Sequence, residues 1–225
     1  MTDLVDRPVP RQARSRERVD VICAAALEVL RRGGIAECTV AAIAAEARIT
    51  PASLYRYFAN VEAVLYAVAT RQLDDTNERL DEALRNLRSR NHAREVLITL
   101  LDDYESRFRG DAALRAIWAG TIAFDSLVEL NVADSRRNGR LIAERVSPHL
   151  RRPVDPAQAF LVTHLVGGGV MLLLQLDDEE ADQLRTGLRA LLVSLLDDGG
   201  SAKRVCTDAP PAVHSRTNAG GGKGS

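Results

Sequence analysis

The stretch TVAAIAAEARITPASLYRYF, residues 39–58, decides how this chain folds. Thr39 and Thr50 each precede a run of helix-favouring residues, and a threonine hydroxyl can accept the first free N–H groups of a helix. Pro51 comes directly after Thr50, at the first helical position, where its missing N–H does no harm. Between the two runs, Ala47-Arg48-Ile49 provides a tight turn. The stretch therefore predicts two short helices joined by a turn, which is the layout of a helix-turn-helix.

The second of these helices has the features of one that reads DNA bases. A helix in the major groove contacts bases with residues near its N-terminus and on its outer face. Ala52 and Ser53 are small and allow the backbone close to the bases, while Tyr55 offers a flat ring suited to a thymine methyl group. Arginines before the first helix and at the turn can reach phosphates. We expect DNA contacts from Arg14, Arg16, Thr39, Arg48, Thr50, Pro51, Ala52, Ser53, Tyr55, Arg56 and Tyr57.

Several of these residues have a purely structural alternative. Thr39 and Thr50 can serve as helix caps with or without a phosphate contact. Tyr55 and Tyr57 are two apart on a helix and cannot share a face, so we expect Tyr57 to be the more buried. The arginines before the first helix can form a solvated arm, and Arg48 can simply be exposed.

The bulk composition favours a helical, intracellular protein. Of 225 residues, 46% are hydrophobic and only 4% are aromatic, and the net charge is −1. Residues 1–60 hold nine arginines against seven acidic residues, whereas the body of the chain is acidic, which weakly favours one DNA-facing end. The cysteines, Cys23, Cys38 and Cys206, are far apart and suit a reducing cytosol without a zinc site or disulfide. No apolar run approaches the roughly 20 residues of a membrane span, so we expect a cytoplasmic protein without a membrane partner.

The period of the apolar residues predicts an all-α chain with an N-terminal three-helix unit and a larger helical domain. We expect a flexible arm over residues 1–13, the helix-turn-helix domain over 14–60, an effector-binding and dimerisation domain over 61–198, and a disordered tail over 199–225.

Residues 34–65 resemble the TetR family of one-component regulators. The resemblance rests on Thr-Val-x-x-Ile-Ala at residues 39–44, on Leu-Tyr-x-Tyr-Phe at 54–58 and on the Glu-x-x-Leu segment at 62–65. It implies a homodimeric repressor that binds double-stranded DNA, with a divergent ligand-binding domain and two C-terminal helices that pair across the dimer. The chain departs from the family pattern at two positions. Arg48 stands where the turn usually has glycine, and Val61 stands where the fourth helix usually begins with a lysine that contacts phosphate.

Beyond the helix-turn-helix, the helices suggest a ligand pocket and a dimer interface. Larger or polar residues within apolar helices indicate a pocket for an unknown, mostly apolar effector, lined by Tyr104, Phe108, Trp118, Thr121, Phe124, Asp125, His164 and Met171. Aromatic residues at helical spacing more often belong to an ordinary core, and His164 fits a structural histidine better than a ligand contact. The last two helices carry leucines for a two-fold interface, or for packing within one subunit, at Leu165, Leu172, Leu184, Leu188, Leu191 and Leu195.

The sequence offers little support for an enzyme. It has no P-loop, no Gly-x-Ser-x-Gly and no His-Glu-x-x-His, and Gly167-Gly168-Gly169 follows no predicted strand. We therefore expect a ligand-responsive transcriptional regulator without a cofactor or metal. The alternative is a dimeric ligand- or protein-binding module with little or no DNA binding, an interpretation that Val61 favours.

Overall fold

The computed structural model describes residues 11–197, and these residues form nine α-helices and two short 3₁₀ helices with no strand. The all-α prediction is confirmed. The helices are α1 (Arg11–Gly33), α2 (Val40–Glu46), α3 (Pro51–Tyr55), α4 (Val61–Leu84), α5 (Arg90–Gly110), α6 (Ala112–Ala123), α7 (Asp125–Val146), η1 (Ser147–His149), α8 (Pro156–Leu173), α9 (Asp178–Val193) and η2 (Ser194–Leu196).

Short polar side chains fix where the helices begin. Thr39, Thr50 and Asn60 each accept the backbone N–H of the residue three positions further on, at 3.1, 3.2 and 2.8 Å. Such caps satisfy N–H groups that would otherwise lack a partner. Helix α1 begins at Arg11, inside the expected arm over residues 1–13. The first ten residues of that arm and the expected tail over 199–225 lie outside the described residues.

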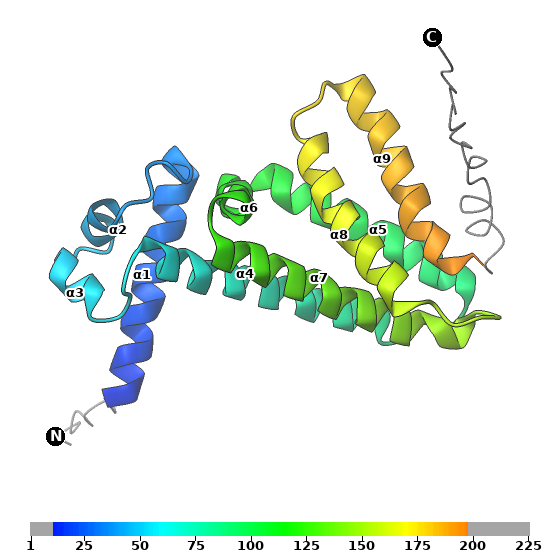
Figure 1. Cartoon of the computed structure of the whole chain (residues 1–225), viewed down its shortest axis with the longest axis horizontal. Helices are drawn as coiled ribbons and strands as arrows, with labels where there is room; N and C mark the ends of the chain where they lie inside the picture. Colours follow the sequence, from blue (N-terminus) through cyan, green and yellow to red (C-terminus); the bar gives the residue numbers. More distant parts are fainter. Residues whose placement is uncertain (1–10, 198–225) are drawn as a thin grey trace, which may run out of the picture.

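The molecule is elongated, with the helix-turn-helix at one end (Figure 1). Helices α1, α2 and α3 form that end, α4 and α7 run lengthwise beside each other, and α5, α8 and α9 lie at the other end. One apolar core joins α1–α3 to the first half of α4, to α6 and to Leu127 of α7. A second core lies among α4, α5, α7, α8 and α9. The first core thus extends well past residue 60, because α4 and α6 complete it, and the expected domain boundary does not separate the two cores.

Glycines allow the helices of the second half to approach closely. A Cβ atom on Gly139 of α7 would lie 2.5 Å from the backbone nitrogen of Phe160 in α8, so these two helices touch backbone to backbone. A Cβ atom on Gly169 of α8 would clash with the side chain of Leu188 in α9. Close helix approach therefore accounts for one of the three consecutive glycines.

Candidate nucleic-acid interface and effector cavity

The turn between α2 and α3 is a Schellman motif built without glycine. The Arg48 N–H donates to Ala45 O at 3.1 Å, and the Ile49 N–H donates to Ala44 O at 2.9 Å. This pattern requires a left-handed residue after the helix, and Arg48 supplies it with φ of +54°. The chain therefore forms an ordinary helix-turn-helix turn at some conformational cost, because a side chain disfavours this backbone region.

Helix α3 presents one face to solvent and buries the other. Leu54 is fully buried in the first core, whereas the neighbouring Tyr55 is 55% exposed. Tyr57 is half-buried against the first core, as expected from its spacing to Tyr55. Pro51 and Ala52 are exposed at the start of the helix, so this end of α3 is open to a bound duplex.

The cap of α3 also engages the side chain that we expected to read bases. The Thr50 hydroxyl accepts the Ser53 N–H at 3.2 Å and donates to the Ser53 hydroxyl oxygen at 3.0 Å. The Ser53 hydroxyl keeps its own proton to donate and a second lone pair to accept, so it can still bond a base edge or a phosphate. Thr39 is exposed and caps α2.

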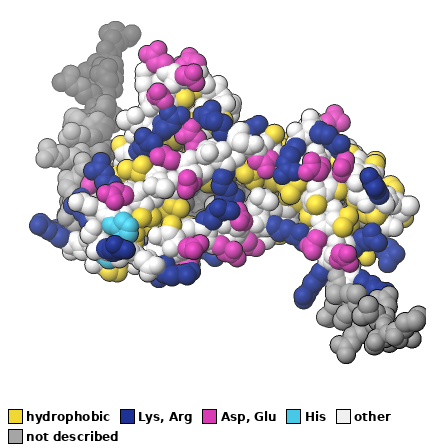
Figure 2. All heavy atoms as spheres, turned by 180° about the vertical axis from the view of Figure 1, so that it is seen from behind, with side chains coloured by type: hydrophobic (Ala, Val, Ile, Leu, Met, Phe, Trp, Pro, Cys, Tyr) yellow, Lys and Arg dark blue, Asp and Glu magenta, His cyan; other side chains and the backbone are white. Residues whose placement is uncertain are grey.

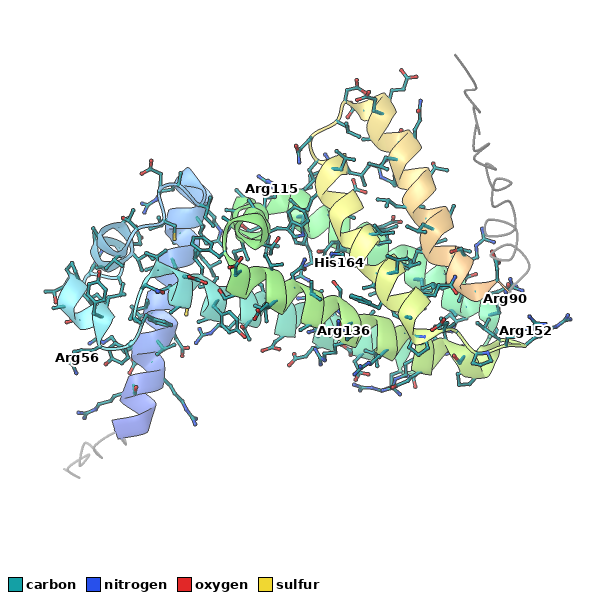
Figure 3. The ribbon with its side chains drawn as sticks, viewed as in Figure 1. Arg56, Arg90, Arg115, Arg136, Arg152 and His164 are labelled. Carbon is teal, nitrogen blue, oxygen red and sulfur yellow. The ribbon has the colours of Figure 1, made fainter. Side chains whose placement is uncertain are left out.

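The arginines at this end are exposed and available. Within residues 11–197, no acidic side chain pairs with Arg14, Arg16, Arg48 or Arg56. Arg56 lies beside the Tyr57 ring, 6.0 Å from its centroid, and marks the α3 end of the molecule (Figure 3). Elsewhere, positive and negative side chains are interspersed over the face seen in Figure 2. These four arginine side chains therefore remain available for phosphate contacts.

Val61 occupies the first position of α4 and packs partly buried against the first core. An apolar side chain there stabilises the start of the helix but offers no charge to a phosphate. No cationic side chain therefore stands at this position, where the family pattern has a lysine.

The body of the protein contains a cavity of about 840 Å³ between α4, α5, α6, α7, α8 and α9. Five of the eight expected pocket residues line it: Tyr104, Phe108, Trp118, Thr121 and His164. All three consecutive glycines of α8 also line it, and around Gly168 the space is open. A volume of this size falls within the range of small-molecule sites.

Three expected pocket residues lie elsewhere, and that part of the prediction is corrected. Phe124 packs against the first core, because the break between α6 and α7 turns it away from the cavity. Asp125 is exposed in the first turn of α7, and Met171 is buried outside the cavity wall.

The sequence interpretation missed a polar stripe on α7. Asn131, Asp134, Ser135 and Asn138 all line the cavity, and their spacing of i, i+3, i+4 and i+7 is that of one helix face. Ser135 bonds the Nδ1 atom of His164 across the cavity wall at 3.0 Å. The spacing was visible in the sequence, but a polar face normally indicates solvent.

Helix α6 connects the cavity to the DNA-binding end. Trp118 and Thr121 line the cavity from this helix, while Asp111 at its start binds Arg31 of α1 through two bonds of 3.2 Å. Gly120 of α6 lies against Ile35, directly after α1. A change at the cavity wall therefore acts on a helix that is packed against α1.

The leucines expected at a dimer interface divide into two groups. Leu165 and Leu172 of α8 are 49% and 48% exposed and also border the cavity, and Leu161 on the same helix is 56% exposed and lies outside the cavity. Leu188 and Leu195 are buried in the second core of the same chain, and their assignment to a dimer interface is therefore wrong. Because α8 and α9 are in close contact at Gly169, these two leucines face the core of their own chain. Leu184 and Leu191 are half-buried against that core.

An exposed helix after a tight turn, joined through one helix to a cavity, is the arrangement typical of a one-component DNA-binding regulator. Residues 22–68 match the family model described as bacterial regulatory proteins, tetR family. These residues have the sequence of that family's DNA-binding domain, which confirms the resemblance of the helix-turn-helix.

Solved structures share the whole fold. A TetR-family transcriptional regulator from Streptomyces coelicolor is 25% identical, with a TM-score of 0.60 over 81% of this chain and 99% of that one. The regulator FadR from Bacillus subtilis, in complex with stearoyl-CoA, is 19% identical, with a TM-score of 0.58 over 80% and 99%. The multidrug binding protein EbrR, complexed with imidazole, is 21% identical, with a TM-score of 0.59 over 82% and 97%. A search of curated proteins gives no significant match.

Proposed function

We propose that this regulator is a cytoplasmic repressor that binds a palindromic operator as a homodimer and is released by a small, mostly apolar effector. The observation that carries the proposal is the shared helix α6, which lines the cavity and binds α1 through the Arg31–Asp111 pair. An effector that fits the cavity better in one arrangement of α6 favours that arrangement, and with it one position of the helix-turn-helix.

Homodimerisation is supported by the outer face of α8. This helix has the length and apolar character of a membrane span, yet only 28% of its residues are buried within one chain. Leu161, Leu165 and Leu172 together leave an apolar surface that a second copy of the chain would cover. Two recognition helices spaced about 34 Å apart read successive turns of a duplex, which accounts for a palindromic operator.

Substitution of Tyr55 tests the DNA-binding part of the proposal. Tyr55→Ala removes the most exposed aromatic ring of α3, so its complex with DNA from the region flanking the gene is expected to weaken at least about tenfold, as for a lost base contact worth about 1–3 kcal/mol. Fluorescence anisotropy at fixed salt measures the loss. Tyr66→Ala is the matched control, because Tyr66 is 43% exposed on α4, outside the expected contacts. Equal affinity of the Tyr55→Ala variant and the unaltered protein would favour the alternative of a ligand- or protein-binding module without a DNA role.

Substitution of Leu165 tests the dimer. Leu165→Glu places a charge in the centre of the proposed interface, so the variant is expected to be monomeric and to lose operator binding while it keeps its helical content. Light scattering after size-exclusion chromatography measures the mass. Ala36→Glu adds the same charge at an exposed position near the other end of the molecule and should leave the dimer intact. A dimeric Leu165→Glu variant would reject α8 as the interface.

A further inference from the structure

One carboxylate in the cavity wall has no cationic partner. Asp134 is half-buried on α7 and accepts hydrogen bonds from the Nδ2 atoms of Asn77 at 2.8 Å and Asn138 at 3.0 Å. Both donors are neutral, and within residues 11–197 no arginine, lysine or histidine forms an ion pair with this carboxylate. Burial raises the pKa of Asp134 above its ordinary value. Burying a charged carboxylate in an apolar wall costs free energy unless another group neutralises its charge.

The two asparagines that hold Asp134 are themselves buried. Asn77 and Asn138 are 3% and 6% exposed, and the Oδ1 atom of each is buried without a hydrogen-bond partner. Their orientation follows from the carboxylate, because rotating either amide would turn its oxygen toward the oxygens of Asp134. Asn138 itself lines the cavity. The two amides thus hold the Asp134 carboxylate in place without neutralising it, and the carboxylate calls for a positively charged group.

The positive side chains of the cavity wall are already neutralised in part. Arg107 donates to Asp75 at 2.7 Å and to the Thr76 hydroxyl at 3.1 Å, and Arg79 donates to the same Asp75 at 3.2 Å. These arginines do not reach Asp134 with a hydrogen bond. An anionic ligand would compete with Asp75 for them, whereas a cation at Asp134 would face only Arg137, which acts on this carboxylate without forming an ion pair with it.

We propose that the effector is a hydrophobic organic cation whose protonated amine or quaternary ammonium group binds at Asp134. Its apolar body lies along the leucines of α4 and α5 that line the cavity, Leu73, Leu80, Leu97, Leu100 and Leu101. The proposal deepens the proposed function, because it names the chemical class of the effector for the same cavity.

Three probes of equal chain length separate charge from apolar character. Dodecyltrimethylammonium, dodecanoate and dodecanol, each below its critical micelle concentration, present a cationic, an anionic and a neutral head. Trp118 is the only tryptophan of the chain and lines the cavity, so its fluorescence reports occupancy without DNA. We expect the cation to bind at least about tenfold more tightly than either other probe. Preference for dodecanoate, or equal binding of all three, would overturn the proposal.

The second part of the experiment removes the charge of Asp134. Asp134→Asn keeps the shape of the side chain and is expected to weaken binding of the cation at least about tenfold, with little effect on dodecanol. Asp103→Asn is the matched control, because Asp103 lines the same cavity but is exposed. Equal losses in both variants would contradict a specific role of Asp134. If Asp134→Asn fails to fold, the order of the three probes on the unaltered protein still decides.

A DNA-release assay distinguishes this inference from the proposed function. Charge-selective binding that depends on Asp134, without release of operator DNA, would support the cation site and reject the effector role of the cavity. Release by an uncharged or anionic compound that quenches Trp118 would keep the proposed function and reject the cation site.

Discussion

Replacement of Arg48 by glycine should stabilise the fold. Arg48 adopts φ of +54°, a conformation that costs a residue with a Cβ atom about 1–2 kcal/mol. Glycine avoids that cost but loses more freedom on folding, which returns about 0.4–1 kcal/mol. The difference leaves a net gain on the order of 0.5–1 kcal/mol for Arg48→Gly. For a domain of this size, 1 kcal/mol corresponds to a rise in Tm of about 2–4 °C.

Arg48→Ala separates backbone strain from lost charge. The alanine variant lacks the guanidinium but keeps the Cβ atom, so its free energy of unfolding is expected to match that of the unaltered protein. Urea denaturation followed by circular dichroism measures all three. If the glycine and alanine variants unfold at the same urea concentration, strain at this turn is refuted, because the two differ only in the Cβ atom.

The same pair of variants tests the expected phosphate contact. Both lack the charge of Arg48, so both should bind operator DNA more weakly, and the slope of log K against log salt should fall by about one unit per subunit. An unchanged slope in both variants would show that Arg48 is exposed without touching DNA.

Three further predictions follow from the described contacts. Gly139→Ala should destabilise the fold by about 1–3 kcal/mol in urea denaturation, because its Cβ atom would press on the α8 backbone. Gly187→Ala, with open space around it, should stabilise α9 by about 0.5–1 kcal/mol. Equal effects of the two substitutions would refute the close approach of α7 and α8. Arg185 donates to the buried Glu105 carboxylate at 2.8 Å and holds its pKa at about 2 instead of 4.5. The carboxylate therefore stabilises the fold above about pH 4.5. This contribution, about 3 kcal/mol, is lost as the pH falls toward 2. Urea denaturation at several pH values should show a smaller acid loss for Glu105→Gln, and an unchanged acid loss would contradict this role. Val61→Lys should strengthen operator binding a few-fold and steepen its salt dependence in anisotropy titrations, while no change would show that no phosphate lies near this position.

The DNA-binding end was predictable because its determinants are local. Caps at Thr39 and Thr50 depend on residues only three positions apart, and each forms the bond expected of it. Tyr57 and Leu54 turn inward because helical spacing alone decides their face. The conformation of Arg48 follows from the same turn, whose geometry demands a left-handed residue whatever its side chain.

The cavity could not be predicted to the same extent, because its walls come from six helices, with α9 contributing Leu192. The polar stripe around Asp134 has the spacing of a solvent-facing helix surface, and only the positions of α4, α5 and α8 show that it faces an internal space. Phe124 was misplaced for the same reason: the break between α6 and α7 decides which core receives its ring. Side chains alone do not specify which neighbour a helix face meets.

Helix α8 shows how far an apolar sequence constrains an assembly. A helix that is apolar all round needs neighbours on every side. Within one chain, α7 and α9 cover the side that carries Val162, Val170 and Leu173, which are at most 4% exposed. The opposite side, with Leu161 and Leu165, is about half exposed in the described chain, and Leu165 also borders the cavity. A second copy would cover it and so give one helix two tasks, closing the cavity in its own subunit and pairing the subunits. If that is so, an effector that presses on the cavity side of α8 also shifts the dimer face, and the spacing of the two recognition helices changes with it.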